Sequence, residues 1–203
     1  MREEKKSDKI AAIYHAIEEL VAEGADLLSM RVSDIAAKAG IGKGTTYEYF
    51  SSKEEMIVKA MVYLVGSMVN RIIKQMEKLS SFQEKFMMLL DEMEEKEKQR
   101  VCILKYLSML HDMNLCQQMH DVLLTEEEAR KAIPMRIIQY LLEEGKKEGI
   151  LSSKYPQFYM ETAMFSRVIS FLMFIEDDLY EKDCTINELK QELYAGICRE
   201  LGV

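Results

Sequence analysis

Proline and glycine are scarce in this chain of 203 residues, which contains two prolines and nine glycines. Both residue types interrupt regular secondary structure. The long stretches between them are rich in glutamate, lysine, leucine and methionine, which are good helix formers. The composition therefore predicts an all-α protein, long enough to bury a sizeable core in one domain or in a small amino-terminal part and a larger body.

Targeting and membrane segments are not evident either. The charged residues 1–6 lead into an amphipathic helix and not into an apolar signal sequence. The longest uncharged run, residues 60–70, is well short of the roughly 18 apolar residues that span a membrane. The four cysteines show no Cys-x-x-Cys spacing, so they are expected to be reduced. We expect a cytoplasmic protein with no membrane partner.

Residue combinations typical of catalysis are also missing. None of the three histidines follows a glutamate at a spacing of three, as the metal ligands of di-metal helical bundles do. Cys116 and His120 lie four residues apart, but a thiol nucleophile also needs an orienting group and an oxyanion site. No strand precedes the glycines at residues 40–44, so they form no phosphate-binding loop. We expect no enzyme, no cofactor and no metal.

The most informative stretch lies between residues 32 and 53. Apolar residues recur there every three or four positions, beginning with Val32 and Ile35, and predict a short helix with one apolar face. Gly40 follows and suits the left-handed conformation that ends a helix. A second short helix then carries hydroxyl groups outward and Phe50 inward. This is the anatomy of a helix-turn-helix, whose second helix enters the DNA major groove.

The charge distribution agrees with that interpretation. The whole chain has a formal net charge of −8, which is unusual for a protein that binds a polyanion. Between residues 31 and 53, however, there are four basic residues and two acidic ones. The predicted DNA face is therefore locally positive. The alternative is a helical pair packed in an ordinary core.

The same stretch resembles the amino-terminal domain of the tetracycline-repressor (TetR) family of transcriptional regulators. The resemblance rests on Asp34–Ile35–Ala36, Ala39–Gly40–Ile41, Lys43–Gly44–Thr45, Tyr47–Glu48–Tyr49–Phe50 and Lys53–Glu54–Glu55, and it extends back to residue 10. It implies a three-helix DNA-binding head on a larger helical body that dimerises and binds a small ligand. By this resemblance, the residues that face DNA are Ser33, Lys43, Gly44, Thr45, Tyr47, Tyr49 and Lys53.

Two positions depart from the family pattern. Thr46 stands where the family usually has a buried leucine, and Gly42 stands where a serine usually caps the recognition helix. Glycine is a tolerable cap, so its cost is about a few tenths of a kcal/mol. These departures leave open a second function, a helical binding or scaffold protein that has lost DNA affinity.

The resemblance also implies a division of the chain. Residues 1–52 form the head, with the motif at about residues 33–52, and a helix over residues 53–76 links it to a ligand-binding and dimerisation domain at residues 77–203. The last two helices, about residues 156–175 and 186–201, form the dimer interface, unless the first is an ordinary buried helix. The candidate interface residues are Phe158, Phe165, Val168, Phe171 and Leu172.

Methionine is over-represented, with sixteen residues. Its flexible, polarizable side chain suits a pocket for apolar ligands, although core packing accounts for most of these residues. We expect a ligand-responsive repressor that binds palindromic double-stranded operator DNA as a homodimer and is released by a partly apolar small molecule. The candidate effector-pocket residues are Met88, Cys102, Tyr106, Met109, His111, Met113 and Cys116.

Overall fold

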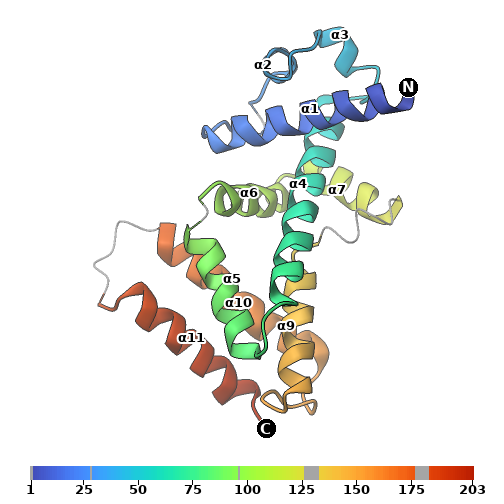
Figure 1. Ribbon diagram of the computed structural model, residues 1–203. Coiled ribbons are helices and arrows are strands. Elements are labelled where there is room, and N and C mark those ends of the chain that lie inside the picture. Colours follow the sequence, from blue (N-terminus) through green and yellow to red (C-terminus); the bar gives the residue numbers. More distant parts are fainter. Residues whose placement is uncertain (1, 28, 96, 126–132, 177–182) are drawn as a thin grey trace. The chain divides into compact units, whose positions relative to one another are not determined.

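The computed structural model describes residues 2–27, 29–95, 97–125, 133–176 and 183–203, and within them it is built from helices (Figure 1). The predicted all-α class is confirmed, and the one β-type contact in these ranges is an isolated bridge between Leu151 and Gly202. The helices are α1 (Arg2–Ala22), α2 (Val32–Lys38), α3 (Lys43–Thr46), α4 (Lys53–Met76), α5 (Phe82–Glu95), α6 (Glu97–Ser108), the 3-10 helix η1 (Met109–His111), α7 (Met113–Thr125), α9 (Met135–Lys147), α10 (Gln157–Glu176) and α11 (Ile186–Leu201).

The chain divides into two compact units. The first contains residues 1–68 and 101–133, and the second contains residues 69–100 and 134–203. Helix α4 contributes to both, because the boundary falls after Met68. Residues 101–125, which the sequence interpretation assigned to the body, belong to the first unit.

The first unit is organised around apolar faces of α1, α2 and α4. Helix α1 packs against α2, and α2 packs against α3 (Figure 1). Ile13, Ile35 and Met56 have no exposed surface, so each of these helices contributes a fully buried apolar residue. Full burial of such a side chain contributes about 1.5–3 kcal/mol.

Helix α2 ends at the glycine that the sequence singled out. Gly40 has φ +67°, in the left-handed region that other residues adopt only with strain. The amide of Ile41 donates to the carbonyl of Ala36 at 3.0 Å, and the amide of Gly40 donates to that of Ala37 at 3.2 Å. These two bonds form a Schellman motif, which sets the sharp turn toward α3.

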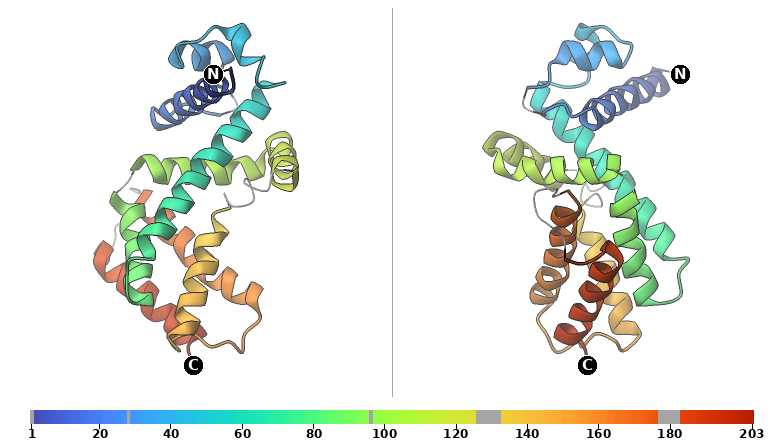
Figure 2. Two further views of the ribbon diagram at one scale, coloured as in Figure 1. Left: turned by 45° about the vertical axis from the view of Figure 1, so that its right-hand side comes forward. Right: turned by 90° about the vertical axis from the view of Figure 1, so that its left-hand side faces the viewer.

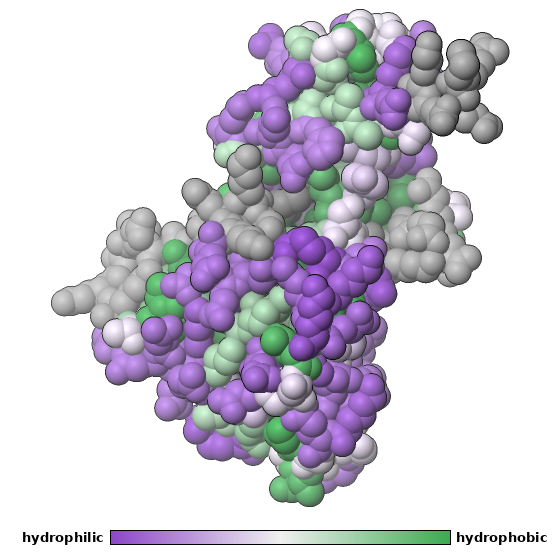
Figure 3. All heavy atoms as spheres, in the orientation of Figure 1, coloured by the Kyte–Doolittle hydropathy of each residue, from purple (hydrophilic) through white to green (hydrophobic). Residues whose placement is uncertain are grey.

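The second unit is a bundle of α5, α9, α10 and α11. Helix α5 contacts the other three, and α10 contacts α9 and α11, as Figure 2 shows. Gly145 in α9 allows a close approach, because a Cβ there would lie 2.6 Å from the Cδ1 of Leu151 and 3.3 Å from the Cδ2 of Phe82. Most side chains on the face seen in Figure 3 are hydrophilic, with scattered hydrophobic ones among them.

The limits of α6 and α9 follow the local sequence. Residues 98–100 lie inside α6, because lysine, glutamine and arginine are good helix formers. Helix α9 begins at Met135, directly after Pro134. Residues 126–132 lie outside the described part of the chain.

Two helices are long and apolar enough to cross a membrane, judged by length and composition alone. Among the described residues these are Lys53–Met76 and Gln157–Ile175. A search of the sequence for uncharged stretches does not identify either helix, because a membrane-spanning helix can contain one or two charged residues. In α4, 67% of the apolar window is buried inside the protein, as in a core helix, whereas in α10 only 33% is buried.

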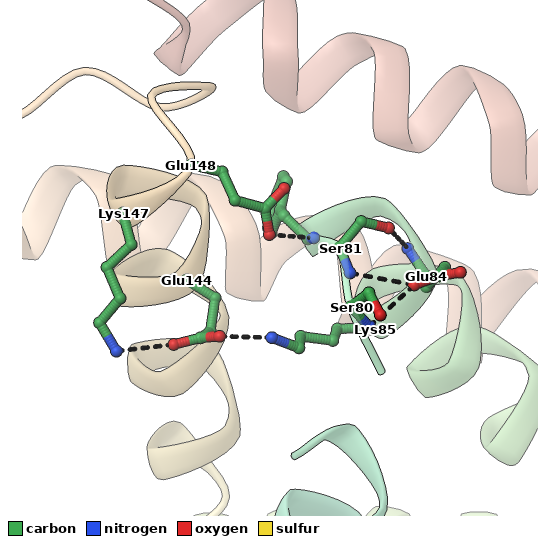
Figure 4. A network of polar contacts seen from close by, with 8 residues as sticks. Ser80, Ser81, Glu84, Lys85, Glu144, Lys147 and Glu148 are labelled. Carbon is green, nitrogen blue, oxygen red and sulfur yellow. Dashed lines mark hydrogen bonds and ion pairs between the residues drawn. The ribbon is translucent and has the colours of Figure 1, made fainter. Parts of the chain in front are cut away.

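A buried lysine joins two helices of the second unit. Lys85 of α5 has only 4% of its surface exposed and forms an ion pair with Glu144 of α9. Glu144 also accepts a hydrogen bond from Lys147 at 2.7 Å, so this carboxylate lies between two ammonium groups (Figure 4). The hydrogen bonds from Lys147 and Lys85 lower the pKa of Glu144. Burial opposes the charge of Lys85, but its bond to Glu144 leaves the pKa of the lysine raised.

We expect Glu144→Gln to destabilise the protein, because it leaves the Lys85 charge buried without its counter-ion. The loss of folding free energy should be about 3 kcal/mol, the size found when one partner of a buried pair is removed. Glu143→Gln is the control: Glu143 is exposed and pairs with Lys146 at the surface, so its loss should cost at most about 0.5 kcal/mol.

Urea denaturation at several pH values measures both effects. Because the pKa of Glu144 is lowered in the folded state, its stabilisation is complete above its unfolded pKa. It should disappear as the pH falls through the folded value, so that wild type and Glu144→Gln converge in acid. Equal stability of the Glu143 and Glu144 variants at pH 7 would contradict the role of the buried pair.

Candidate nucleic-acid interface

Helix α3 is shorter than the sequence predicts. It begins after Gly42, the predicted cap position, and its α-helical part ends at Thr46. Residues 47–49 continue as a tight turn, in which the amide of Glu48 donates to Thr45 at 3.2 Å and that of Tyr49 to Thr46 at 3.1 Å. Glycine and β-branched threonine are weak helix formers, which accounts for the tighter winding.

The inner side of this segment is buried as expected. Phe50 is 3% exposed, and its ring centroid lies 6.1 Å from that of Tyr14 in α1. Thr46 has no exposed surface, and its hydroxyl donates to the carbonyl of Lys43 at 2.6 Å. The threonine in the usual leucine position therefore leaves no unsatisfied polar group.

The outer side carries the residues predicted to face DNA. All seven retain exposed surface, and Tyr47, at 48%, is the most exposed of the aromatic ones. Hydroxyl and ammonium groups of this kind bind phosphate oxygens and base edges. Their contact with DNA stays a prediction. The exposed members are Ser33, Lys43, Gly44 and Tyr47, and the partly exposed ones are Thr45, Tyr49 and Lys53.

Two of the four basic residues counted in the motif are engaged within the protein. Lys38 extends to Glu23 of α1, with its Nζ 2.5 Å from the carboxylate, and this hydrogen bond raises the pKa of the lysine. Arg31 pairs with Asp34 at 3.1 Å. A count of the charged residues within the motif does not reveal the Lys38–Glu23 pair, because the two residues are fifteen positions apart in the sequence. The other two basic residues of the motif, Lys43 and Lys53, retain exposed surface on the predicted DNA side.

The start of α4 is organised by residues that the sequence analysis did not select. The hydroxyl of Ser52 accepts a hydrogen bond from the amide of Glu55 at 3.0 Å, which caps the helix. The carboxylate of Glu55 in turn accepts from the amide and the hydroxyl of Ser51. A serine followed three residues later by glutamate is a recognisable capping pattern. It leaves Lys53 as the first residue of α4, where the helix dipole favours a phosphate.

Two of the candidate effector residues line a common cavity. Met109 and His111 line a cavity of about 260 Å³ in the first unit, together with Leu27 and Leu115. Met88 belongs to the second unit, and Met113 is 90% exposed. Of the others, Tyr106 is buried, Cys116 is partly exposed, and the side chain of Cys102 lies outside the description.

The candidate interface residues on α10 fall into two groups. Phe171 and Leu172 lie in the core of the second unit, with at most 1% of their surface exposed, and Val168 is nearly buried. Phe158, at 80%, is exposed, and Phe165 is partly exposed. Of these five candidates, Phe158 and Phe165 are therefore the ones that retain exposed apolar surface.

The fold and the exposed polar helix define a helix-turn-helix protein of the transcription-regulator class. Residues 13–60 match the family model described as bacterial regulatory proteins, tetR family. The amino-terminal head of the chain is therefore that of the TetR family of transcriptional regulators.

A curated relative, the fatty acid metabolism regulator protein of Bacillus subtilis (strain 168), is 29% identical over 86 residues, which are 42% of this chain and 44% of the relative. The match thus spans less than half of that relative's length. Both it and the family model describe regulators and not enzymes. Among the residues whose placement is described, no group of three or more His, Cys, Asp or Glu side chains could hold a metal ion.

Solved structures resemble the whole chain. The fatty acid degradation regulator FadR from Bacillus halodurans is 20% identical with a TM-score of 0.65, over 95% of this chain and 96% of that one. FadR from Bacillus subtilis in complex with stearoyl-CoA is 17% identical with a TM-score of 0.65, over 93% and 97%. At these identities, the likeness shows the fold.

We expect Lys43→Ala and Tyr47→Phe to weaken DNA binding without changing the melting temperature, because both side chains point away from the core. Lys43→Ala should also flatten the dependence of log affinity on log salt by about one unit per subunit. Phe50→Ala should instead cost about 3–5 kcal/mol of stability. Titration of a labelled operator at several salt concentrations and thermal denaturation measure these effects. Wild-type affinity in both surface variants would show that α3 does not read DNA.

Proposed function

We propose that the protein is a cytoplasmic repressor that binds a palindromic operator as a homodimer and is released by a partly apolar small molecule. The observation that carries the proposal is that the helix-turn-helix has one buried side and one exposed polar side. Thr46 and Phe50 are buried, while Lys43 and Tyr47 on the same short segment are exposed. A segment that only packs a core has no need of such an outward polar face.

Dimerisation is supported by the surface of α10. Only 33% of its apolar window is buried, and Phe158 and Met173 are 80% and 59% exposed. An apolar face of this kind on a protein in water favours burial against a partner. A twofold dimer would carry two recognition helices to half-sites about 34 Å apart, which is one turn of DNA.

The relatives and the cavity beside η1 support a proposal for the effector class. The curated relative regulates fatty acid metabolism by its name, and a structural neighbour was solved with stearoyl-CoA. We therefore propose an acyl-CoA as the effector class, since it combines a polar head with an apolar chain. The cavity at Met109 and His111, about 260 Å³, is below the roughly 300–1,000 Å³ typical of ligand sites.

A larger ligand at this cavity requires the surrounding segments to separate. One wall comes from Asp26 and Leu27, between α1 and α2, and the other from Ser108 to Leu115. Separation of these two walls would therefore move the segment between α1 and α2, which is part of the head. A ligand that acts in this way must bind the separated state more tightly than the DNA-bound state.

The central test is a mobility-shift assay on the DNA immediately upstream of the protein's own gene. We expect the wild-type protein to bind this DNA and stearoyl-CoA to release it. By linkage, operator-bound protein should bind the acyl-CoA more weakly than free protein does, by the same factor. Equal affinity of free and DNA-bound protein for the acyl-CoA would rule out release by this effector. The absence of DNA binding would favour the scaffold alternative.

We expect the protein to be a dimer in light scattering at micromolar concentration, and Phe165→Glu to convert it to a monomer. The added carboxylate would be desolvated in the interface, which opposes association strongly. Met113→Glu is the matched control, because Met113 is an exposed apolar residue of α7 outside the proposed interface. A monomeric wild-type protein would contradict the proposed interface, as would a Phe165→Glu protein that remains dimeric.

A further inference from the structure

The turn that joins the helix-turn-helix to α4 is held by one carboxylate. An oxygen of Glu55 accepts hydrogen bonds from both the amide and the hydroxyl of Ser51, at 2.7 and 2.5 Å. The other oxygen lies 3.2 Å from the Nζ of Lys59, one helical turn further along. Glu55 thus ties the turn before α4 to the helix itself.

The Glu55 side chain is ionised in this arrangement. Its pKa is lowered chiefly by the hydrogen bond from the Ser51 hydroxyl, against the opposing effect of burial, and further by the Ser51 amide and by Lys59. An ionised carboxylate accepts stronger hydrogen bonds than a neutral group. The turn is therefore held by charge-assisted bonds.

The turn borders a cavity in the described part of the first unit. Ser51, Glu55 and Lys59 line this cavity of about 270 Å³, and α7 supplies its other wall. Ser51 is exposed, and the two hydrogen bonds that Glu55 accepts from it restrain its position. The residues from α7 are Gln118, Asp121, Val122 and Thr125.

We propose that Glu55 is a positioning residue for DNA binding, which fixes the Ser51–Ser52 turn so that Lys53 and the first turn of α4 meet a phosphate. Glu55 does not itself touch DNA. The inference rests on the proposed operator binding. It adds a residue that neither the family resemblance nor the sequence pattern placed in the DNA interface.

The sign of the effect separates this role from simple electrostatics. A carboxylate near DNA repels the phosphates, so its removal should tighten binding. If Glu55 positions the turn, its removal should weaken binding instead.

Glu54 is the matched control. It is the preceding residue, its side chain is 31% exposed against 26% for Glu55, and it lies 4.0 Å from the Nζ of Lys53. Glu54→Ala and Glu55→Ala therefore make the same charge change, one and two residues after Lys53.

The experiment compares full-length wild type, Glu54→Ala and Glu55→Ala by fluorescence anisotropy on the operator fragment, at several salt concentrations and well below the melting temperature. We expect Glu55→Ala to weaken binding about tenfold, the loss of one charge-assisted contact. Its log–log salt slope should fall by about one unit per subunit. Glu54→Ala should bind at least as tightly as wild type.

Two further variants keep the test decisive if Glu55→Ala does not fold. Ser51→Ala removes the hydroxyl donor and leaves the amide, and Glu55→Gln retains an acceptor without the charge, so both should weaken binding to a smaller extent. A role confined to stability would lower the melting temperature and leave the affinity of the folded protein unchanged. Glu55 variants that bind as tightly as wild type would overturn the inference, whereas wild-type protein without operator binding would overturn the proposed function itself.

Discussion

The burial of α4 is the constraint on which the other features depend. This helix begins with Lys53 in the predicted DNA interface and continues without interruption to Met76, and its residues belong to both compact units. Met56, Met61 and Ile72 have no exposed surface. A helix held by so many apolar contacts cannot rotate freely, so the direction of its first turn is set by the core. The short polar turn at Ser51 and Ser52 then has only local freedom, which a few hydrogen bonds are sufficient to remove.

The helix-turn-helix has one side buried in the core and one side exposed to solvent, although it is only a few residues long. Helix α3 is only four residues long, too short to be stable alone. It is held by the turn at Gly40, by the buried Thr46 and by Phe50 against α1. Positive charge on the predicted DNA side is scarce, because Arg31 and Lys38 are paired with carboxylates of the protein, and Lys43 and Lys53 are the other basic residues of the motif. An acidic chain can therefore present a DNA face only if these two side chains and the neighbouring hydroxyl groups are placed accurately, which makes the positioning of the turn important.

Buried ion pairs have a different role in the second unit. Lys85 links α5 to Glu144 of α9, and Lys190, which is 5% exposed, links α11 to Asp91 and Glu94 of α5. Such pairs add little net stability, because desolvation offsets their attraction, but breaking one is costly. They therefore oppose alternative packings of α5 against its neighbours. The same helices leave apolar surface on α10 uncovered, which is the surface that the proposed dimer would bury.

Local features of the sequence were sufficient to predict the helical class, the end of α2 at Gly40, the start of α4 at Lys53 and the bounds of α11 at Ile186 and Leu201. Each depends on periodicity, on one glycine or on a cap, and these act over a few residues. The same local features predicted the helix-turn-helix, in which Phe50 is buried and Lys43 and Tyr47 are exposed; the family resemblance added the prediction that the exposed residues face DNA. Only the tertiary structure decided that Lys38 is bound to Glu23, that Phe171 lies in the core of its own unit, and that Glu55 faces a cavity shared with α7. These outcomes depend on contacts between residues far apart in the chain, and no short-range pattern encodes them.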